Sequence, residues 1–522
     1  MVAGPSVTCP HAPLDVYELN TRVWLRDLGV SRLAEVPDAV LDQIAARGFS
    51  LVWLMGVWLP SEHAARIARA EPALRREAAL VLDDFTEDDI VASPYAVARY
   101  EVSPLLGGTA DLQQIRSRLL RRGIGVLLDF VPNHTAHDHR FVTEHPEYYV
   151  RAGPGSVPEE TFLAPGGARL MRGRDPYFAP WSDTAQLDYR SESTHRAMIA
   201  ELRSVARLCD GVRCDMAMLV LSEIFGRTWN KPGALPPAAP DLASGEFWAA
   251  AIDAARREQP GFVFMAEAYW GTEPRLHELG FDYTYDKVLY YELAAGRAAG
   301  VVGHLSESVR PRGAVRFLEN HDEERAAHRF PLDLHRVAAL VAMTLPGLCL
   351  FHQGQLEGAR RKIPVQLARR PVEAADPILA AYYLELSSLL GDPVLRTGVW
   401  RLLHPEPAWA ENRSHDAFVA YAWDGSSLGR TADGSHRLLV ANLAPHAAQC
   451  RLRLELPGIV GRPIAIREVF GAGSTPAGDR VAPGGRPVYL RAGDGLAREG
   501  LFVDLPPRTG QVLRVETASL GA

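Results

Sequence analysis

Three acidic residues end three successive apolar segments of this 522-residue chain, and their types suit acid–base and nucleophilic chemistry. Asp215 ends the segment GVRCD, Glu267 ends GFVFMAE, and Asp322 ends VRFLENHD. A carboxylate at the end of a buried strand is costly unless it is paired or takes part in chemistry. In a barrel of parallel strands the carboxyl ends meet on one face, which carries the active site. The sequence therefore predicts one shared site for the three carboxylates.

Two of these carboxylates have neighbours that suit distinct roles. Arg213 and Asp215 are two residues apart on a predicted strand, so both side chains point into the barrel. A guanidinium beside a carboxylate keeps it ionised, as a carboxylate nucleophile requires. Glu267 is followed by Tyr269 and Trp270, where desolvation would raise its pKa and let it protonate a leaving oxygen. Taken alone, Arg213 and Asp215 also fit a structural ion pair.

The elements that would position these residues alternate between apolar strands and helices from residue 17 to about residue 350. This alternation is typical of βα units around a parallel sheet. Predicted helices include residues 109–122, 195–209 and 245–258. The eight predicted strands are residues 16–23, 51–55, 125–130, 211–215, 262–267, 281–285, 315–319 and 348–352. Eight such units predict an α/β fold, a (β/α)8 TIM barrel.

Changes in composition predict further regions beside the barrel. Residues 60–92 form a charge-rich helical insertion, and residues 134–189 are rich in Gly and Pro, which indicates a small irregular subdomain inserted after strand 3. Beyond residue 396, short alternating strands such as AFVAYAW and HRLLVANL indicate a C-terminal antiparallel β-sandwich domain. The predicted barrel has two parts, residues 1–133 and 190–396. The inserted subdomain is predicted over residues 134–189, and the sandwich over residues 397–522.

Composition and charge limit the classes of partner. The chain has 47% hydrophobic and 23% charged residues and a net charge of −7, which argues against binding to nucleic acid or to an anionic membrane and is compatible with a neutral sugar. No signal peptide is evident, and no apolar stretch approaches the roughly 20 residues of a membrane span. The five cysteines lack CxxC spacing, which predicts free thiols and a cytoplasmic protein. The oligomeric state is left open.

Four ordered motifs resemble those of the alpha-amylase family of glycoside hydrolases, family thirteen in the usual numbering. DFVPNH at residues 129–134 is similar to the family's first conserved region, and GVRCDMAML at residues 211–219 to its second. FMAEAYWG at residues 264–271 resembles the third region, and FLENHDEER at residues 317–325 the fourth. Four motifs in order are far more specific than one short pattern, and the resemblance extends over essentially the whole chain.

The resemblance implies roles for individual residues. Asp215 would be the nucleophile, Glu267 the general acid/base and Asp322 the stabiliser of the transition state. The residues implied in positioning or substrate binding are Arg213, His134, His321 and Tyr95, with Asp129 and Trp270 as further candidates. Asp129 also fits a purely structural role, and Tyr95 also fits a core position. The implied reaction retains configuration through a covalent glucosyl ester on Asp215, with about 5–5.5 Å between nucleophile and acid.

Departures from the family pattern leave the substrate open. Met218 and Leu219 occupy the positions of a frequent Lys-His pair that contacts leaving-group sugars, so recognition of a long glucan is in doubt. Met216 is bulkier than the common alanine or valine. Asn133 matches a position that often helps to bind structural calcium, but Leu219 replaces the histidine usual there. We therefore predict no cofactor and no metal among the site residues, with structural calcium left as an alternative.

Three functions fit the sequence. The first is a retaining α-glycosidase that acts on malto-oligosaccharides or related small-molecule α-glucosides. The second is a transglycosylase or disaccharide-forming enzyme, of the glucanotransferase or trehalose-synthase type, with the same three carboxylates. The third is a catalytically inactive barrel used as a glycan-binding or assembly module, which the presence of all three carboxylates disfavours.

Overall fold

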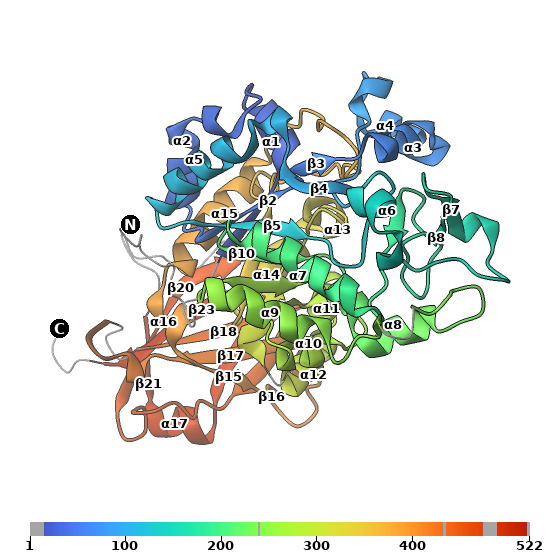
Figure 1. The fold of residues 1–522 in the computed structure, drawn as a ribbon. Coiled ribbons are helices and arrows are strands. Elements are labelled where there is room, and N and C mark those ends of the chain that lie inside the picture. The colour runs from blue at the N-terminus through green and yellow to red at the C-terminus, as the bar shows by residue number, and fades with distance from the viewer. Residues whose placement is uncertain (1–14, 238–240, 309, 432–434, 473–487, 519–522) are drawn as a thin grey trace. The chain divides into compact units, whose positions relative to one another are not determined.

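A computed structural model describes residues 15–237, 241–308, 310–431, 435–472 and 488–518. Its central feature is a closed barrel of eight parallel strands in the order β1-β14-β13-β12-β11-β10-β5-β2. Figure 1 labels β2, β5 and β10 of this barrel. The strands are β1 (Asp15–Asn20), β2 (Leu51–Met55), β5 (Gly125–Phe130), β10 (Gly211–Cys214), β11 (Val263–Ala266), β12 (Tyr283–Tyr285), β13 (Ala314–Arg316) and β14 (Leu348–His352). Each overlaps one predicted strand, although β13 shares only residues 315–316 with the predicted strand 315–319, and the predicted (β/α)8 barrel is confirmed.

Strands β2, β5, β10 and β14 are buried at every residue. A parallel strand covered on both faces is a continuous apolar segment, which is why the sequence locates these strands well. The first strand ends earlier than predicted, because residues 21–23 begin helix α1 (Thr21–Asp27). There the Asn20 side chain accepts a hydrogen bond from the backbone N–H of Val23 at 3.5 Å, as a helix N-cap does.

The segments that connect the barrel strands contain helices and short two-stranded sheets. The three predicted helices correspond to α5 (Gly108–Leu120), α7 (Glu192–Ala206) and α9 (Phe247–Glu258). The segment after β2 contains β3 (Trp58–Pro60), α3 (Glu62–Ala70), α4 (Pro72–Val81) and β4 (Val97–Val102). The segment after β5 contains β6 (His134–Ala136), α6 (Arg140–Glu144), β7 (Thr161–Leu163), β8 (Arg169–Met171) and β9 (Thr184–Gln186). This second segment, with two small two-stranded sheets, is the irregular insertion predicted after the third barrel strand.

The described chain divides into two compact units. One contains residues 16–285 and 361–373, and therefore β2, β5, β10, β11 and β12. The other contains residues 286–360 and the chain from residue 374 onward, including β13, β14 and the C-terminal sheets.

The C-terminal region consists of antiparallel strands in two sheets, as predicted for a β-sandwich. A six-stranded sheet has the order β15-β17-β18-β23-β20-β21, and a three-stranded sheet has the order β16-β19-β22. The strands are β15 (Val399–Leu403), β16 (Glu406–Pro407), β17 (Phe418–Asp424), β18 (His436–Asn442), β19 (Ala448–Leu452), β20 (Pro463–Ala472), β21 (Val488–Ala492), β22 (Leu501–Leu505) and β23 (Thr509–Thr517). Apolar side chains of both sheets share one buried cluster, which includes Val440 and Cys450.

The cysteines behave as the sequence predicts within the described residues. Cys209, Cys214, Cys349 and Cys450 are free and buried, while Cys9 lies outside the described residues. Across the same residues, we find no helix with both the length and the apolar character needed to cross a membrane.

Candidate active site

The backbone brings Asp215 and Glu267 side by side at the ends of two neighbouring strands. Strand β10 pairs in parallel with β11, with Cys214 opposite Ala266. The hydrogen-bond ladder continues for one residue more, because the N–H of Glu267 donates to the carbonyl of Cys214 at 3.0 Å. Each carboxylate therefore follows the last residue of its strand directly, and the predicted proximity of these two is confirmed.

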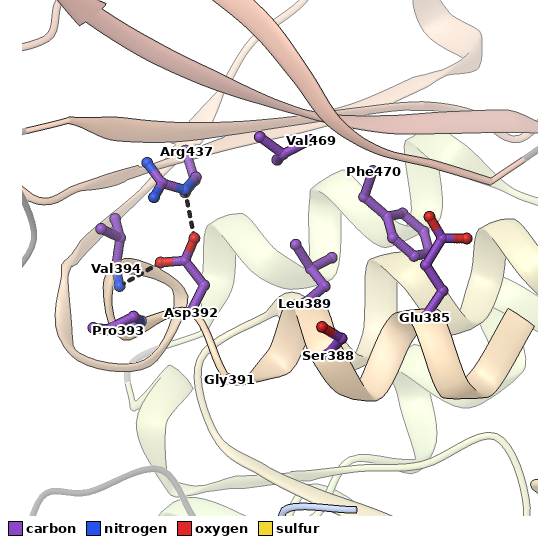
Figure 2. A pocket seen from close by; sticks show the side chains of 10 residues that line it. All are labelled: Glu385, Ser388, Leu389, Gly391, Asp392, Pro393, Val394, Arg437, Val469 and Phe470. Atoms are coloured by element: carbon purple, nitrogen blue, oxygen red, sulfur yellow. Dashed lines mark hydrogen bonds and ion pairs between the residues drawn. The ribbon is translucent and has the colours of Figure 1, made fainter. Parts of the chain in front are cut away.

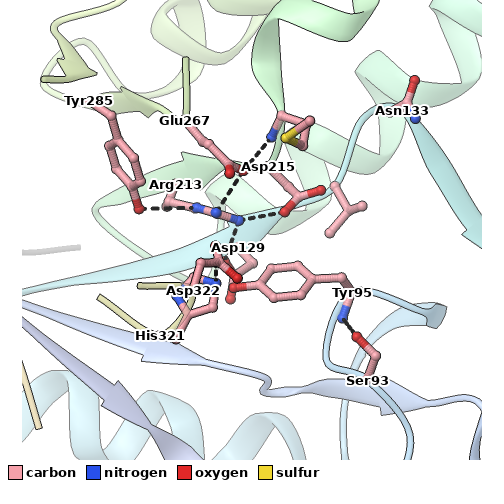
Figure 3. A network of polar contacts seen from close by, with 12 residues as sticks. Ser93, Tyr95, Asp129, Asn133, Arg213, Asp215, Glu267, Tyr285, His321 and Asp322 are labelled. Carbon is pink, nitrogen blue, oxygen red and sulfur yellow. Dashed lines mark hydrogen bonds and ion pairs between the residues drawn. The ribbon is translucent and has the colours of Figure 1, made fainter. Parts of the chain in front are cut away.

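Arg213 lies between these carboxylates and is fully buried (Figure 3). Its Nη1 donates to Asp215 Oδ1 at 2.6 Å, and its Nη2 donates to Glu267 Oε2 at 2.8 Å. Asp129, which faces Arg213 in the register of β5 and β10, places its Oδ1 3.7 Å from Nη1. One guanidinium thus holds two carboxylates in fixed positions, beside a third.

Three aromatic rings surround the same guanidinium. The Cζ atom of Arg213 lies 5.2 Å from the ring centre of Trp53, 5.1 Å from that of Tyr95 and 5.9 Å from that of Tyr285. Nε also donates to the Tyr285 hydroxyl at 3.4 Å. The faces of aromatic rings attract cations, so these rings stabilise the buried charge and exclude water from it. Tyr95 was predicted as a site residue, whereas Trp53 and Tyr285 were not.

Burial governs the charge of Asp215 more strongly than the sequence suggests. Desolvation raises the pKa of the Asp215 carboxyl above its ordinary value, Arg213 opposes this rise, and the negative charge of Glu267 adds to it. Arg213 therefore favours the ionised form of Asp215, as the sequence predicts, but the loss of water, which the sequence pattern does not show, outweighs the ion pair. For Arg213 itself, burial acts to lower the pKa, but Glu267, Tyr95, Tyr285 and Asp215 raise it well above its usual range.

Glu267 is fixed by donors on both oxygens. Its Oε2 accepts from Arg213 and from the backbone N–H of Met216 at 2.8 Å, and its Oε1 accepts from the Tyr269 hydroxyl at 2.6 Å. Met216 has φ 42°, and Trp270 has φ 64°, in the left-handed region that non-glycine residues rarely occupy. Such a backbone costs on the order of 1–3 kcal/mol and is concentrated at functional sites. The strained turn at Met216 directs its N–H at Glu267.

His134 and Asn133 lie at the start of the inserted segment. Burial lowers the pKa of His134 to about 4, although a hydrogen bond from the imidazole to the Tyr95 backbone opposes the shift, so the imidazole is neutral near pH 7. The Asn133 amide is committed to Gln186, whose Nε2 donates to Asn133 Oδ1 at 2.9 Å. Among the described residues, no group of three or more His, Cys, Asp or Glu side chains is placed to hold a metal. The oxygen of the Asn133 side chain is thus already engaged within the protein.

Exposed aromatic side chains lie beside the loop that follows Glu267. Trp270 is 42% exposed and meets Tyr177 edge to face, with ring centres 4.9 Å apart. Tyr177 and Phe178 are 68% and 71% exposed, and Asp175 Oδ1 accepts hydrogen bonds from the backbone N–H groups of both. Trp270 was predicted as a site residue, whereas Tyr177 and Phe178 were not. Their one signal in the sequence is that they form an aromatic pair inside a Gly- and Pro-rich loop.

His321 and Asp322 lie on the loop after β13, in the second compact unit. His321 is buried, and its Nε2 lies 3.0 Å from Asp322 Oδ2, whereas the Asp322 side chain is 44% exposed. Asn320 Oδ1 accepts from the backbone N–H groups of Asp322 and Glu323 at 2.9 and 3.0 Å. This turn presents the Asp322 carboxylate to solvent.

The chain can now be compared with known proteins. Residues 85–375, more than half of the chain, match the family model described as alpha amylase, catalytic domain. The chain belongs to the alpha-amylase family. It is 24% identical over 442 residues to alpha-amylase MalA of Haloarcula japonica, a match that covers 82% of this chain and 55% of that protein. It is 20% identical over 312 residues to alpha-amylase 3 of Dictyoglomus thermophilum, covering 54% and 57% of the two chains.

The present member of the alpha-amylase family thus spans a little over half the length of these two curated relatives. Solved structures agree with its fold. A maltogenic alpha-amylase, AmyB from Thermotoga neapolitana, is 20% identical with a TM-score of 0.65, and the match covers 97% of this chain and 99% of that one. A debranching enzyme from Nostoc punctiforme is 14% identical with a TM-score of 0.62, and the match covers 98% of this chain and 99% of that one. At these identities the likeness supports the fold alone.

Proposed function

We propose that this member of the alpha-amylase family is a retaining α-glycosidase acting on α-glucosidic bonds of malto-oligosaccharides or related α-glucosides. The observation that carries the proposal is the single buried guanidinium of Arg213, which binds Asp215 and Glu267 through its two terminal nitrogens. Retaining enzymes hold their two carboxyl groups close, about 5–5.5 Å apart, whereas inverting enzymes leave room for a water molecule between them. Two carboxylates bound to one guanidinium fit the shorter spacing.

The first step in this proposal is attack by Asp215 on the anomeric carbon. Arg213 occupies Oδ1 of Asp215, so Oδ2 is the attacking oxygen. Glu267 gives its proton to the glycosidic oxygen as the bond to that oxygen breaks, which leaves a β-glucosyl ester on Asp215 and an alcohol product. The proton resides on Oε1, because Oε2 already accepts two N–H bonds and the Tyr269 hydroxyl at Oε1 can either donate or accept.

The second step hydrolyses the ester. Glu267, now ionised, takes a proton from water while the water oxygen attacks the anomeric carbon and the bond to Asp215 breaks. The product keeps the α configuration, and both carboxyl groups return to their starting states. We assign Asp322 the role of stabilising positive charge on the sugar ring. Support for this role comes from its position after β13, since the carboxyl ends of barrel strands open on one face.

Transfer to a sugar hydroxyl is the second candidate, and one observation favours it. The exposed aromatic surface of Tyr177, Phe178 and Trp270 adjoins the loop that carries Glu267. Aromatic faces can stack on the apolar faces of sugar rings, so this surface would hold an acceptor in place of water. Incubation with maltotetraose separates the candidates, since products longer than maltotetraose or trehalose-type disaccharides indicate transfer, and glucose and maltose alone indicate hydrolysis.

The substrate class is tested by profiling products on maltose, trehalose, sucrose, isomaltose and soluble starch. The names of the relatives, alpha-amylase and maltogenic alpha-amylase, support an α-glucan or its oligomers. Asp215→Asn removes the attacking oxygen and is expected to lower turnover by about 10³-fold or more. The matched control is Asp138→Asn, which changes an exposed aspartate outside the Arg213 site and should leave turnover unchanged. Binding of glucans without any turnover would instead support the inactive-module alternative.

We also propose that the protein works in the cytoplasm. The support is the presence of four buried free thiols among the described cysteines, since reduced cysteines are the rule in that compartment. Localisation of a tagged full-length chain by cell fractionation tests this proposal.

A further inference from the structure

Away from the Arg213 site, a pocket with a volume of about 580 Å³ lies entirely within the first compact unit. Its walls come from α1, β3 and α3 and from the segments around residues 91–94 and 103–106. Most of the lining is apolar, with Leu25, Val30, Trp58 and Leu59 among its residues. A volume of this size is within the range of small-molecule sites, about 300–1,000 Å³.

Three arginines stand out in this apolar lining: Arg22, Arg26 and Arg69. Arg22 donates from Nη2 to the carbonyl oxygens of Ala92 and Val365, at 3.1 and 3.3 Å. Its Nε is buried and, within the described residues, has no hydrogen-bond partner. Burial lowers the pKa of Arg22 to about 10. A partly buried guanidinium without a carboxylate is costly, so its presence at a pocket favours an anionic ligand.

The other two arginines increase the positive charge around Arg22. Arg22 and Arg26 are four residues apart on α1, so they lie on the same side of the helix, where two like charges repel. Arg69 Nε donates a hydrogen bond to the carbonyl oxygen of Ile90 at 3.0 Å. Within the described part of the chain, none of the three arginines forms an ion pair, and Glu62 is the one carboxylate among the described lining residues.

A pocket in the other unit shows the opposite situation (Figure 2). It has a volume of about 550 Å³ and is lined by residues of α15 (Pro377–Leu390), α16 (Pro393–Thr397), β18 and β20. Its arginine, Arg437, donates from Nε to Asp392 Oδ2 at 2.6 Å, and Asp392 Oδ1 accepts from the N–H of Val394 at 2.8 Å. Arg437 is thus paired with Asp392, and Glu385 adds a second carboxylate to the lining, so that pocket has no excess of positive charge to attract an anion.

We propose that the pocket of Arg22, Arg26 and Arg69 binds a small organic anion, a carboxylate or phosphate carried on an apolar body. Guanidinium groups bind carboxylates and phosphates through paired N–H donors. The apolar walls around Leu25 and Trp58 accommodate the body of the ligand. A neutral sugar would satisfy neither the charge nor the apolar lining, so this ligand differs in class from the substrate proposed above.

The pocket is distinct from the Arg213 site but shares a wall with it. Gly56 and Trp58 line the pocket. The Gly56 N–H donates to Asp129 Oδ2 at 3.4 Å, and Trp58 Nε1 donates to the Asp129 carbonyl at 2.8 Å. Arg213, Asp215 and Glu267 are absent from the described lining of the pocket. Binding at the pocket therefore does not depend on the proposed catalytic function.

Calorimetric titration of the full chain with octanoate, octyl phosphate, 1-octanol and inorganic phosphate tests the proposal. We expect saturable binding of at least one of the two octyl anions at one site per chain, with 1-octanol and inorganic phosphate each at least tenfold weaker. The tighter of octanoate and octyl phosphate identifies the head group. Absence of binding by both octyl anions, or equal binding of 1-octanol, would overturn the proposal.

Variants locate the binding site. Arg26→Gln removes an exposed charge that makes no ion pair among the described residues, so the fold should persist, and affinity for the octyl anion should fall tenfold or more. The matched control, Arg121→Gln at the end of α5, changes an equally exposed arginine outside the pocket and should leave affinity unchanged. If Arg26→Gln binds the octyl anion with unchanged affinity, the ligand lies elsewhere and the assignment is refuted. The assignment is also refuted if saturating maltotriose displaces the anion from the Asp215→Asn variant, because the ligand would then occupy the Arg213 site.

Discussion

Two arginines of the same unit, the buried Arg213 and the partly buried Arg22, show how neighbours decide what a desolvated charge does. Both are desolvated, yet the pKa of Arg213 is raised well above its usual range and that of Arg22 is lowered to about 10. Arg213 bonds to Asp215 and Glu267, whereas Arg22 reaches only backbone carbonyls among the described residues. A desolvated cation that is paired with carboxylates holds those carboxylates in place. A desolvated cation that has no carboxylate partner can instead bind an anionic ligand.

The largest expected effect comes from removing the guanidinium of Arg213. Arg213→Leu leaves Asp215, Glu267 and Asp129 as neighbouring buried acids, and breaking a buried ion pair costs about 3–5 kcal/mol. Urea denaturation should show this loss at pH 7. The matched variant Arg22→Leu, which loses bonds to carbonyls only, should cost less, about 1–3 kcal/mol. Equal losses would mean that the carboxylates do not distinguish the two arginines.

The pH profile of activity depends on the same carboxylates. Asp215 attacks only when ionised, and its pKa is raised by burial. As pH falls, kcat/KM should therefore decline at a higher pH than for an ordinary aspartate, whose pKa is about 3.9. Arg213 lowers the pKa of Asp215, so Arg213→Lys, which weakens the contact, should move this decline to still higher pH. A decline centred near pH 4 in both proteins would contradict the assignment.

A smaller effect is expected at the Tyr269 hydroxyl. Tyr269→Phe removes the 2.6 Å hydrogen bond to Glu267 Oε1. A hydrogen bond to a charged group contributes about 1.5–3 kcal/mol, so kcat/KM should fall by roughly tenfold or more. Tyr291→Phe, which alters an exposed hydroxyl on α11 (Lys287–Ala294), is the control and should be neutral. An unchanged kcat/KM for Tyr269→Phe would show that Glu267 does not need this contact.

The smallest effect concerns the strained backbone at Met216. A left-handed conformation costs an L-residue roughly 1–2 kcal/mol, which glycine avoids. At an ordinary position glycine is less stable than alanine by about 0.5–1 kcal/mol. At Met216, with φ 42°, the order should reverse, so that Met216→Gly is more stable than Met216→Ala by about 1 kcal/mol in thermal unfolding. The usual order would show that the turn carries no strain.

The sequence predicted the barrel well for a physical reason. Strands buried on both faces are continuous apolar segments, and an acid at the end of such a segment, as at Asp215 and Glu267, departs visibly from the pattern. The predicted contact between Arg213 and Asp215 follows from their two-residue spacing on one strand and is present.

Other features depend on contacts that no local pattern encodes. The second bond of Arg213, to Glu267, joins residues 54 positions apart, and its contacts with Trp53 and Tyr285 span still longer separations. The rise in the pKa of Asp215 could not be read from its spacing to Arg213, because burial is a property of the whole surrounding structure. The pocket around Arg22 likewise combines segments from residue 22 to residue 368.

The central claim, that Asp215 forms a covalent glucosyl ester, can be tested directly by mass spectrometry. Glu267→Gln removes the base needed for hydrolysis, and α-glucosyl fluoride supplies a leaving group that needs no proton, so the ester should accumulate. We predict an intact mass increased by one glucosyl unit, with the modified peptide assigned to Asp215. An unmodified protein despite substrate turnover, or a label on any other residue, would contradict the account.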